Sequence, residues 1–147
     1  MARSEITATS TIAAASHALK DAIGGIWTFA NAAATSGGYL LIEQLVVKDI
    51  GQGMPDLDLV LFNATIAGTV TDDSPFDPTD ADILNIVAVI PVGGGNWSDF
   101  TDNSVASVDV YKAVKLDGTS LFGALVARSV VTTAADYPQL TLVVSQD

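Results

Sequence analysis

The side chains that could do chemistry in this sequence are few, and their spacing fits no catalytic motif. His17 is the only histidine, cysteine is absent, and all but Glu5 and Glu43 of the 17 acidic residues are aspartates. A serine or threonine nucleophile needs a base beside it, but His17 lies in an alanine-rich segment without a G-x-S-x-G motif. One histidine also falls short of the usual zinc ligand sets. We therefore expect no catalytic residue, metal ligand or cofactor, and we interpret His17 as an incidental surface or capping residue.

The most polar stretch begins at Asp72, and it is where a calcium site would be sought. An EF-hand loop needs aspartate first, glycine sixth and glutamate twelfth. Counted from Asp72, the sixth residue is Asp77 and the twelfth is Ile83. Counted from Asp77, these positions hold Asp82 and Ala88. Neither count fits, so we interpret these acids as capping and solvated residues. A hydrolase with two facing carboxylates is a further alternative, although the spacing pairs no two acids.

Two tryptophans offer a different chemistry, because an exposed indole can stack on a sugar ring. Trp97 follows the glycine triplet 93–95, which matches neither a P-loop nor the dinucleotide-binding fingerprint. We interpret the triplet as a mobile strand connection. Packing in a core or in a subunit contact is the simpler interpretation for both Trp27 and Trp97. A carbohydrate-binding or receptor-binding module remains the alternative function.

The charge balance restricts the partners. The formal net charge is −11 and the isoelectric point is about 4.1, so the surface repels phosphate backbones and we expect no nucleic-acid partner. The longest uncharged run, residues 22–42, is interrupted by glycines and polar residues, so we predict no membrane span and no signal peptide. Hydrophobic residues make up 49% and the mean hydropathy is +0.42, which fits either a valine-rich core or a homo-oligomer contact.

Alternation of apolar and polar residues predicts strands along most of the chain. Residues 5–11 fit an edge strand. Residues 39–48 form the longest predicted strand, and their apolar side chains on both faces predict a central strand that is covered on each side. Residues 57–61 alternate leucine with other residues, as in a half-buried strand. Shorter strands are predicted at residues 26–29, 86–92 and 140–144.

Local motifs predict where the chain turns. Asp77 as N-cap and Pro78 as first helical residue predict one helical turn, with Asp80 in it. Asp117-Gly118 favours a two-residue hairpin, because this dipeptide tolerates the positive φ angles of a type I′ turn. One-sided apolar faces are predicted on either side of this hairpin, made by Val108, Val110, Val114 and Leu116 before it and by Phe122, Ala124, Val126 and Val130 after it.

Together these patterns predict an all-β chain. We expect one antiparallel β-sandwich domain, jelly-roll-like, with about eight or nine strands and one short helical turn. Residues 1–15 are predicted as an N-terminal arm or edge strand, and residues 16–147 as the sandwich domain.

The order of several segments resembles the decoration (cement) proteins of tailed-phage heads. The resemblance covers residues 16–145. In residues 16–25, Asp21, Ile23 and Gly24 match a "Y-x-x-G-D-x-I/V-G" stretch of that group, whereas His17 and Lys20 replace its tyrosine and glycine. The other matching segments are Leu45-Val46-Val47-Lys48-Asp49, Leu57-Asp58-Leu59-Val60-Leu61-Phe62, Asp72-Asp73-Ser74-Pro75-Phe76, Thr79-Asp80-Ala81-Asp82 and Leu121-Phe122-Gly123-Ala124-Leu125-Val126-Ala127-Arg128.

This resemblance implies a structural protein of a bacteriophage virion and not an enzyme. It implies binding to the major capsid protein on the outer surface of an assembled HK97-type shell, as a dimer or trimer that bridges capsomers, after a stay in the host cytoplasm. We expect the contacts in a flexible arm at residues 1–10 and in loops at residues 72–82 and 93–100. The predicted contact residues are Arg3, Glu5, Asp72, Asp73, Phe76, Asp77, Trp97 and Phe100.

Overall fold

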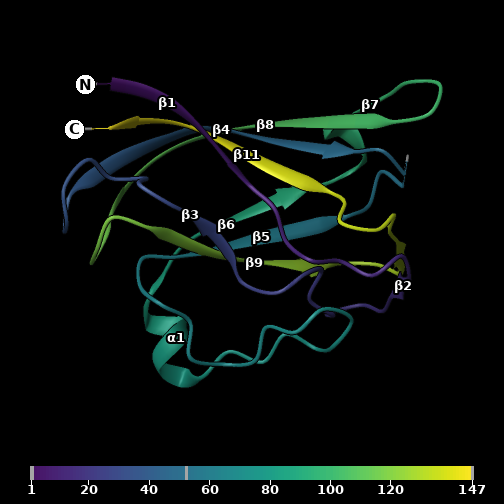
Figure 1. Ribbon diagram of the computed structural model, residues 1–147, viewed down its shortest axis with the longest axis horizontal. Coiled ribbons are helices and arrows are strands. Elements are labelled where there is room, and N and C mark those ends of the chain that lie inside the picture. The colour runs from purple at the N-terminus through teal and green to yellow at the C-terminus, as the bar shows by residue number, and fades with distance from the viewer. Residues whose placement is uncertain (1, 52, 147) are drawn as a thin grey trace.

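Two antiparallel sheets packed face to face make up the protein (Figure 1). The structure is a computed structural model that describes residues 2–51 and 53–146, so the parts of our predictions that fall on Met1, Gln52 and Asp147 lie outside the described residues. The strands are β1 (Ala2–Ala8), β2 (Ser16–His17), β3 (Trp27–Phe29), β4 (Tyr39–Asp49), β5 (Leu57–Phe62), β6 (Ile86–Val92), β7 (Trp97–Asp99), β8 (Ser104–Lys115), β9 (Leu121–Ala127), β10 (Val131–Thr132) and β11 (Gln139–Gln146). One α-helix, α1 (Asp80–Leu84), and one 3₁₀ turn, η1 (Gly94–Asn96), complete the described elements.

The strand order is that of a jelly roll. One sheet runs β1-β11-β4-β8-β7 and the other β3-β9-β5-β6, while β2 and β10 form a separate two-stranded pair. If β2, β7 and β10 are set aside and the other eight strands are numbered along the chain, the sheets read 1-8-3-6 and 2-7-4-5. This is the jelly-roll arrangement, in which successive strands mostly change sheets. The predicted sandwich and its eight main strands are confirmed.

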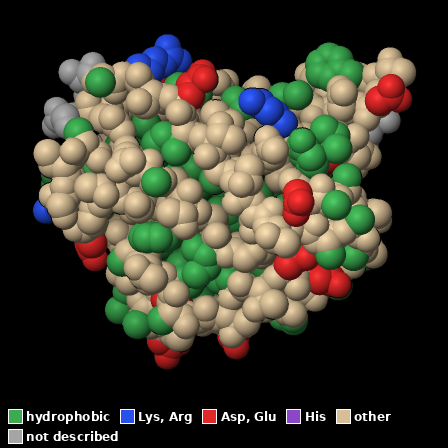
Figure 2. Space-filling model, viewed as in Figure 1, with side chains coloured by type: hydrophobic (Ala, Val, Ile, Leu, Met, Phe, Trp, Pro, Cys, Tyr) green, Lys and Arg blue, Asp and Glu red, His purple; other side chains and the backbone are tan. Residues whose placement is uncertain are grey.

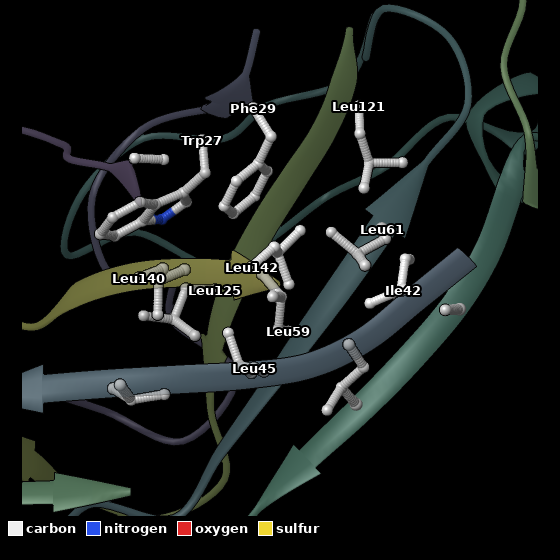
Figure 3. Close-up of a cluster of buried hydrophobic side chains, with 14 of the residues drawn as sticks. Trp27, Phe29, Ile42, Leu45, Leu59, Leu61, Leu121, Leu125, Leu140 and Leu142 are labelled. Carbon is white, nitrogen blue, oxygen red and sulfur yellow. The ribbon is translucent and has the colours of Figure 1, made fainter. Parts of the chain in front are cut away.

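The core lies between the two sheets (Figure 3). Leu45 of β4 and Leu142 of β11 face Leu59 of β5 and Leu125 of β9, and all four are fully buried. Trp27 closes one end of the core, where its indole N–H donates to the carbonyl of Ile23 at 3.0 Å. Burying each such side chain contributes about 1.5–3 kcal/mol. The inward leucines of the sequence pattern therefore supply the main stabilising contact.

Strand β4 differs from its prediction because it contains a β-bulge. The pairing with β11 and β8 shifts between Ile42 and Gln44, so Glu43 is an extra residue that changes which side chains face inward. As a result Ile42 and Leu45 both point into the core, although they are three residues apart. The outward side of β4 is not covered as predicted, since Tyr39 is 55% exposed there. β8, with 12 residues, is also one residue longer than β4.

Strands β5 and β9 are more buried than predicted, because the chain covers their outer side as well. Val60, Phe62 and Ala124 are buried in a second cluster, beneath the segment that runs from β5 to α1. Phe76 of that segment packs edge-on against Phe62, with ring centroids 6.3 Å apart. The prediction of a half-buried strand at residues 57–61 is therefore wrong. Val130, predicted to continue this face, lies beyond β9 and is 72% exposed.

The helical turn begins two residues later than predicted. Thr79, not Asp77, is the N-cap: its hydroxyl accepts from the Asp82 N–H, and the Asp82 carboxylate accepts from the Thr79 N–H. This reciprocal pair is a capping box, with aspartate in the place usually taken by glutamate.

The N-terminal residues form an edge strand and not a flexible arm. Residues 2–8 pair with β11 from Ala2–Gln146 to Ala8–Leu140, and Ile12 lies in the core. The predicted mobile loop after β6 is also ordered, because η1 and β7 follow each other directly there.

The hairpin predicted at Asp117-Gly118 is wrong. β8 and β9 belong to different sheets, so residues 116–120 cross from one sheet to the other. Gly118 is not among the glycines with positive φ, unlike Gly24, whose φ is +76°. The dipeptide favours a tight turn, but the jelly-roll order places β8 and β9 in different sheets, so they cannot pair as a hairpin.

These two glycines provide a test of the connection. We expect Gly118→Ala to change the free energy of unfolding by less than about 1 kcal/mol, because the conformation suits alanine and the space is open. Gly24→Ala is the matched comparison, since its new Cβ would lie 2.5 Å from Ser10 Oγ at a left-handed φ. It should cost at least about 1–2 kcal/mol. Urea denaturation of both variants measures this, and a Gly118→Ala loss as large as that of Gly24→Ala would contradict the crossing geometry.

Candidate functional site

The predicted contact residues do not form one surface. Arg3 and Glu5 lie on β1, at one edge of the five-stranded sheet, whereas Trp97 lies on β7, at the opposite edge, and Phe100 follows it. The remaining four lie in the segment between β5 and α1, on the outer side of the other sheet; these are Asp72, Asp73, Phe76 and Asp77. A partner that binds one group therefore leaves the others free.

Asp72 is a structural acceptor more than a contact residue. Its Oδ1 accepts from the Gly24 N–H at 2.8 Å and from His17 Nε2 at 2.9 Å, and its Oδ2 accepts from the Ala13 N–H at 2.8 Å. His17 is fully buried, so its interpretation as a surface residue is wrong. The other ring nitrogen, Nδ1, has no hydrogen-bond partner among the described residues. These hydrogen bonds link residues 13–24, which follow β1, to the acidic segment that contains Asp72.

The hydrogen bonds lower the pKa of Asp72. Partial burial raises it, but the N–H groups of Ala13 and Gly24 and the His17 ring outweigh burial and bring the pKa below the ordinary value. The charged form is therefore favoured in the folded state.

Asp82 has the same role at the base of α1. It is 2% exposed, and it accepts from the N–H groups of Ala67 at 2.8 Å, Gly68 at 2.7 Å and Thr79 at 2.9 Å. The bonds from Ala67 and Thr79 lower its pKa and exceed the opposing effect of burial. Our interpretation of Asp82 as a capping residue is therefore confirmed, since it closes the capping box with Thr79, but Asp82 is buried and not solvated. Asp73, Asp77 and Asp80 are the acids of this stretch that lie exposed.

The aromatic candidates also lie apart. Trp27 is fully buried, as the packing interpretation predicts, so the two tryptophans form no common platform. Trp97 is half-buried, and its indole N–H donates to the carbonyl of Pro55 at 3.1 Å. Phe100 is 55% exposed. Within residues 2–51 and 53–146 no three His, Asp or Glu side chains are grouped to hold a metal ion, and no helix is long and apolar enough to cross a membrane.

The outward side of the five-stranded sheet is a regular surface, and we call it the open sheet face. Figure 1 shows no further layer outside this sheet. Three rows of outward side chains cross β1, β11, β4 and β8: Arg3–Ser145–Leu41–Ala113, Glu5–Val143–Gln44–Asp109 and Thr7–Thr141–Val46–Ser107. Thr141, Val143 and Ser145 are only 5–8% exposed, because their neighbours in the sheet shield them. The outward side chains are thus mostly apolar or uncharged polar. Glu5 and Asp109 lie on β1 and β8, and Arg3 of β1 pairs at 3.1 Å with Glu43 of the central strand β4.

Sequence reasoning missed this face. The bulge at Glu43 and the pairing of β1 with β11 decide which side chains point outward, and neither has a local sequence signal. The one available signal was the weak polarity of strand 140–144, whose outward residues are threonine and valine.

Charge is unevenly distributed between this sheet and the rest of the chain. The strands of the five-stranded sheet hold four of the six basic residues and five of the 17 acidic ones. Nearly all of the net charge of −11 therefore lies in the connections and α1. On the side drawn in Figure 2, most of the basic groups lie along the top, where acidic groups also lie, and further acidic groups lie along the bottom and lower right. The segment 72–82, part of which packs on the outer side of the four-stranded sheet, holds five of the 17 acidic residues.

Comparisons with known proteins do not place the chain in a family. No protein-family model matches the sequence, and no curated protein matches it. Among solved structures, a chain of infectious bursal disease virus is similar at 12% identity and a TM-score of 0.37, over 96% of this chain and 32% of that one. Murine APRIL is similar at 11% identity and a TM-score of 0.38, over 97% and 98% of the two chains. A virus-like particle of the prawn Macrobrachium rosenbergii extra small virus is similar at 11% identity and a TM-score of 0.29, over 100% and 81%.

This chain thus spans about a third of the infectious bursal disease virus chain. The jelly-roll assignment stands on the strand order described above.

The Asp72 cluster predicts a pH dependence of stability. Because its folded-state pKa is lowered, its contribution is fully present above the unfolded-state value of about 4 and is lost as pH falls through the folded-state pKa. We expect Asp72→Asn to cost about 1–3 kcal/mol at pH 7 and to approach the parent protein in stability below about pH 3. Thermal unfolding between about pH 2.5 and 7 measures this. Asp73→Asn is the matched control, since that exposed neighbour should show a small, pH-independent effect, and an equal loss in both variants would refute the cluster's role.

Proposed function

We propose that this protein is a structural component of a bacteriophage virion, a decoration protein that binds the outer surface of an assembled HK97-type capsid. The open sheet face is the observation that carries the proposal. Its outward side chains are mostly apolar or uncharged polar, with few charges, and they lie on a regular sheet, as in many protein–protein interfaces. The order of segments that resembles phage decoration proteins supports the same conclusion.

The charge distribution supports one orientation on the shell. A surface of nearly balanced charge can approach a partner without strong repulsion, whereas the acidic connections on the opposite side favour water. In this proposal the open sheet face contacts the major capsid protein, and the acidic segment between β5 and α1 points outward. The acids of that segment then serve solubility before assembly and in the finished particle. Symmetric placement of many copies makes a modest affinity per site sufficient.

Binding to heads that lack this protein tests the proposal. Val46→Lys places a charge in the centre of the open sheet face, and it should weaken retention at least about tenfold, because the charge loses water on docking without a partner. Heads from a phage strain with this gene deleted are mixed with the purified protein, and bound copies are quantified after sedimentation. Asp73→Lys and Asp77→Lys, exposed in the acidic segment, are the controls and should bind like the parent protein.

The outcomes separate the parts of the proposal. Absence of the protein from purified virions, or no binding by the parent chain, would overturn the function itself. Loss of binding in the two aspartate variants, with Val46→Lys unaffected, would overturn the orientation, since the acidic segment would then be the contact.

A further inference from the structure

A pocket opens at the end of the sandwich where the chain leaves β5 and where it crosses from β8 to β9. It has a volume of about 330 Å³, which lies within the range of about 300–1,000 Å³ that is usual for small-molecule sites. Its lining comes from residues 63–65 and 117–120 and from Phe122. We call it the crossing pocket. It contains neither tryptophan, so it is separate from the aromatic residues considered above for sugar stacking.

Backbone hydrogen bonds hold the walls of the crossing pocket. The Asp117 N–H donates to the carbonyl of Asn63 at 3.1 Å and so joins the two walls. Behind the crossing connection, the Gly37 N–H donates to the carbonyl of Gly118, also at 3.1 Å. The walls are therefore positioned without the use of their own polar side chains, and a preformed site of this kind loses little conformational entropy when a ligand binds.

The polar side chains of the lining are left unused by the fold. Within residues 2–51 and 53–146 they form no side-chain hydrogen bond or ion pair; they belong to Asn63, Thr65, Asp117, Thr119 and Ser120. The Oδ1 atom of Asn63 is buried without a partner. In the other connections, by contrast, the buried aspartates accept backbone N–H groups. Unused hydrogen-bonding groups that converge on a preformed pocket indicate a ligand.

The lining also has an apolar wall. Phe122 of β9 packs on the second cluster, on the outer side of the four-stranded sheet, and it stays partly buried. One aromatic face beside hydroxyl, amide and carboxylate groups matches a pyranose ring, which has an apolar C–H face and a rim of hydroxyl groups.

The charge of the crossing pocket restricts the ligand further. Asp117 is the one charged residue of the lining, so a ligand with phosphate, sulfate or carboxylate groups would be repelled. Asp117 and Thr65 are exposed, so the pocket opens to solvent and the rest of a longer ligand has room to leave it. These features favour a neutral sugar at the end of a chain.

We propose that the crossing pocket binds the terminal residue of a neutral glycan. Asp117 accepts hydrogen bonds from two neighbouring sugar hydroxyls, Thr119 bonds a third, and Phe122 packs against the ring. Because Phe122 lies on the side opposite the open sheet face, the pocket stays accessible when that face is covered. The inference needs no capsid and is independent of the proposed function.

A ¹H–¹⁵N NMR titration of the full chain tests this inference. The probes are the methyl α- and β-glycosides of glucose, galactose, mannose and N-acetylglucosamine, whose blocked anomeric oxygen imitates a glycan end. We expect at least one to bind with a dissociation constant on the order of 1 mM, with amide shifts concentrated at residues 63–65 and 117–122. Asp117→Asn should weaken binding about tenfold, because it removes a charged acceptor, and Thr119→Val should weaken it at least about threefold.

Matched controls make the same two changes outside the pocket. Asp73→Asn and Thr101→Val alter exposed residues that do not line it, and both variants should bind like the parent chain. Binding by none of the glycosides overturns the inference, as do shifts centred elsewhere or equal losses in the control variants. Binding of the free sugars without their methyl glycosides would overturn the glycan end as ligand. Glucuronic acid that binds as tightly as the glycosides would overturn the neutral class.

Discussion

The apolar packing of the two sheets against each other is the contact on which the rest of this protein depends, because it determines where the connecting segments must run. Because all but one of the connections between successive main strands cross from sheet to sheet, much of the connecting backbone lies outside the two main sheets. Its N–H groups need other acceptors, and aspartate supplies them. Asp49, Asp72 and Asp82 each accept two or three backbone N–H groups in these connections. The aspartate-rich composition is thus in part a consequence of the topology.

The alternation of apolar and polar residues predicted the features that depend on local sequence, such as strand positions. It did not predict features that depend on contacts between distant segments. The strands at residues 57–61, 86–92 and 140–144 were placed correctly, and so was the jelly-roll class, because inward leucines and valines repeat along them. The bulge at Glu43 was missed because it exists only relative to the neighbouring strands. The burial of His17 depends on Asp72, 55 residues away, so no local signal marks it. The N-cap at Thr79 could have been predicted from the sequence, because the Thr79-x-x-Asp82 spacing resembles a capping box.

The candidate surface sites were predicted or missed for the same reason. Sequence reasoning found the acidic segment and interpreted its acids as capping or solvated residues, but it had no signal that Asp82 is buried beneath α1. The open sheet face arises from strand order, since it is the place where the jelly roll leaves a sheet uncovered. The acidic connections cover the outer side of the smaller sheet instead. The open sheet face and the acidic segment therefore lie on opposite sides of the sandwich.

The pairing of β1 with β11 has a consequence for engineering. Ala2 lies opposite Gln146, and Figure 1 shows β1 and β11 beside each other. A short glycine-rich linker could therefore join them into a ring without disturbing either sheet. Ring closure would restrict the unfolded chain more than the folded one and so favour folding. New ends could then be opened at the Gly118 connection, which would give a circular permutant with the same two sheets.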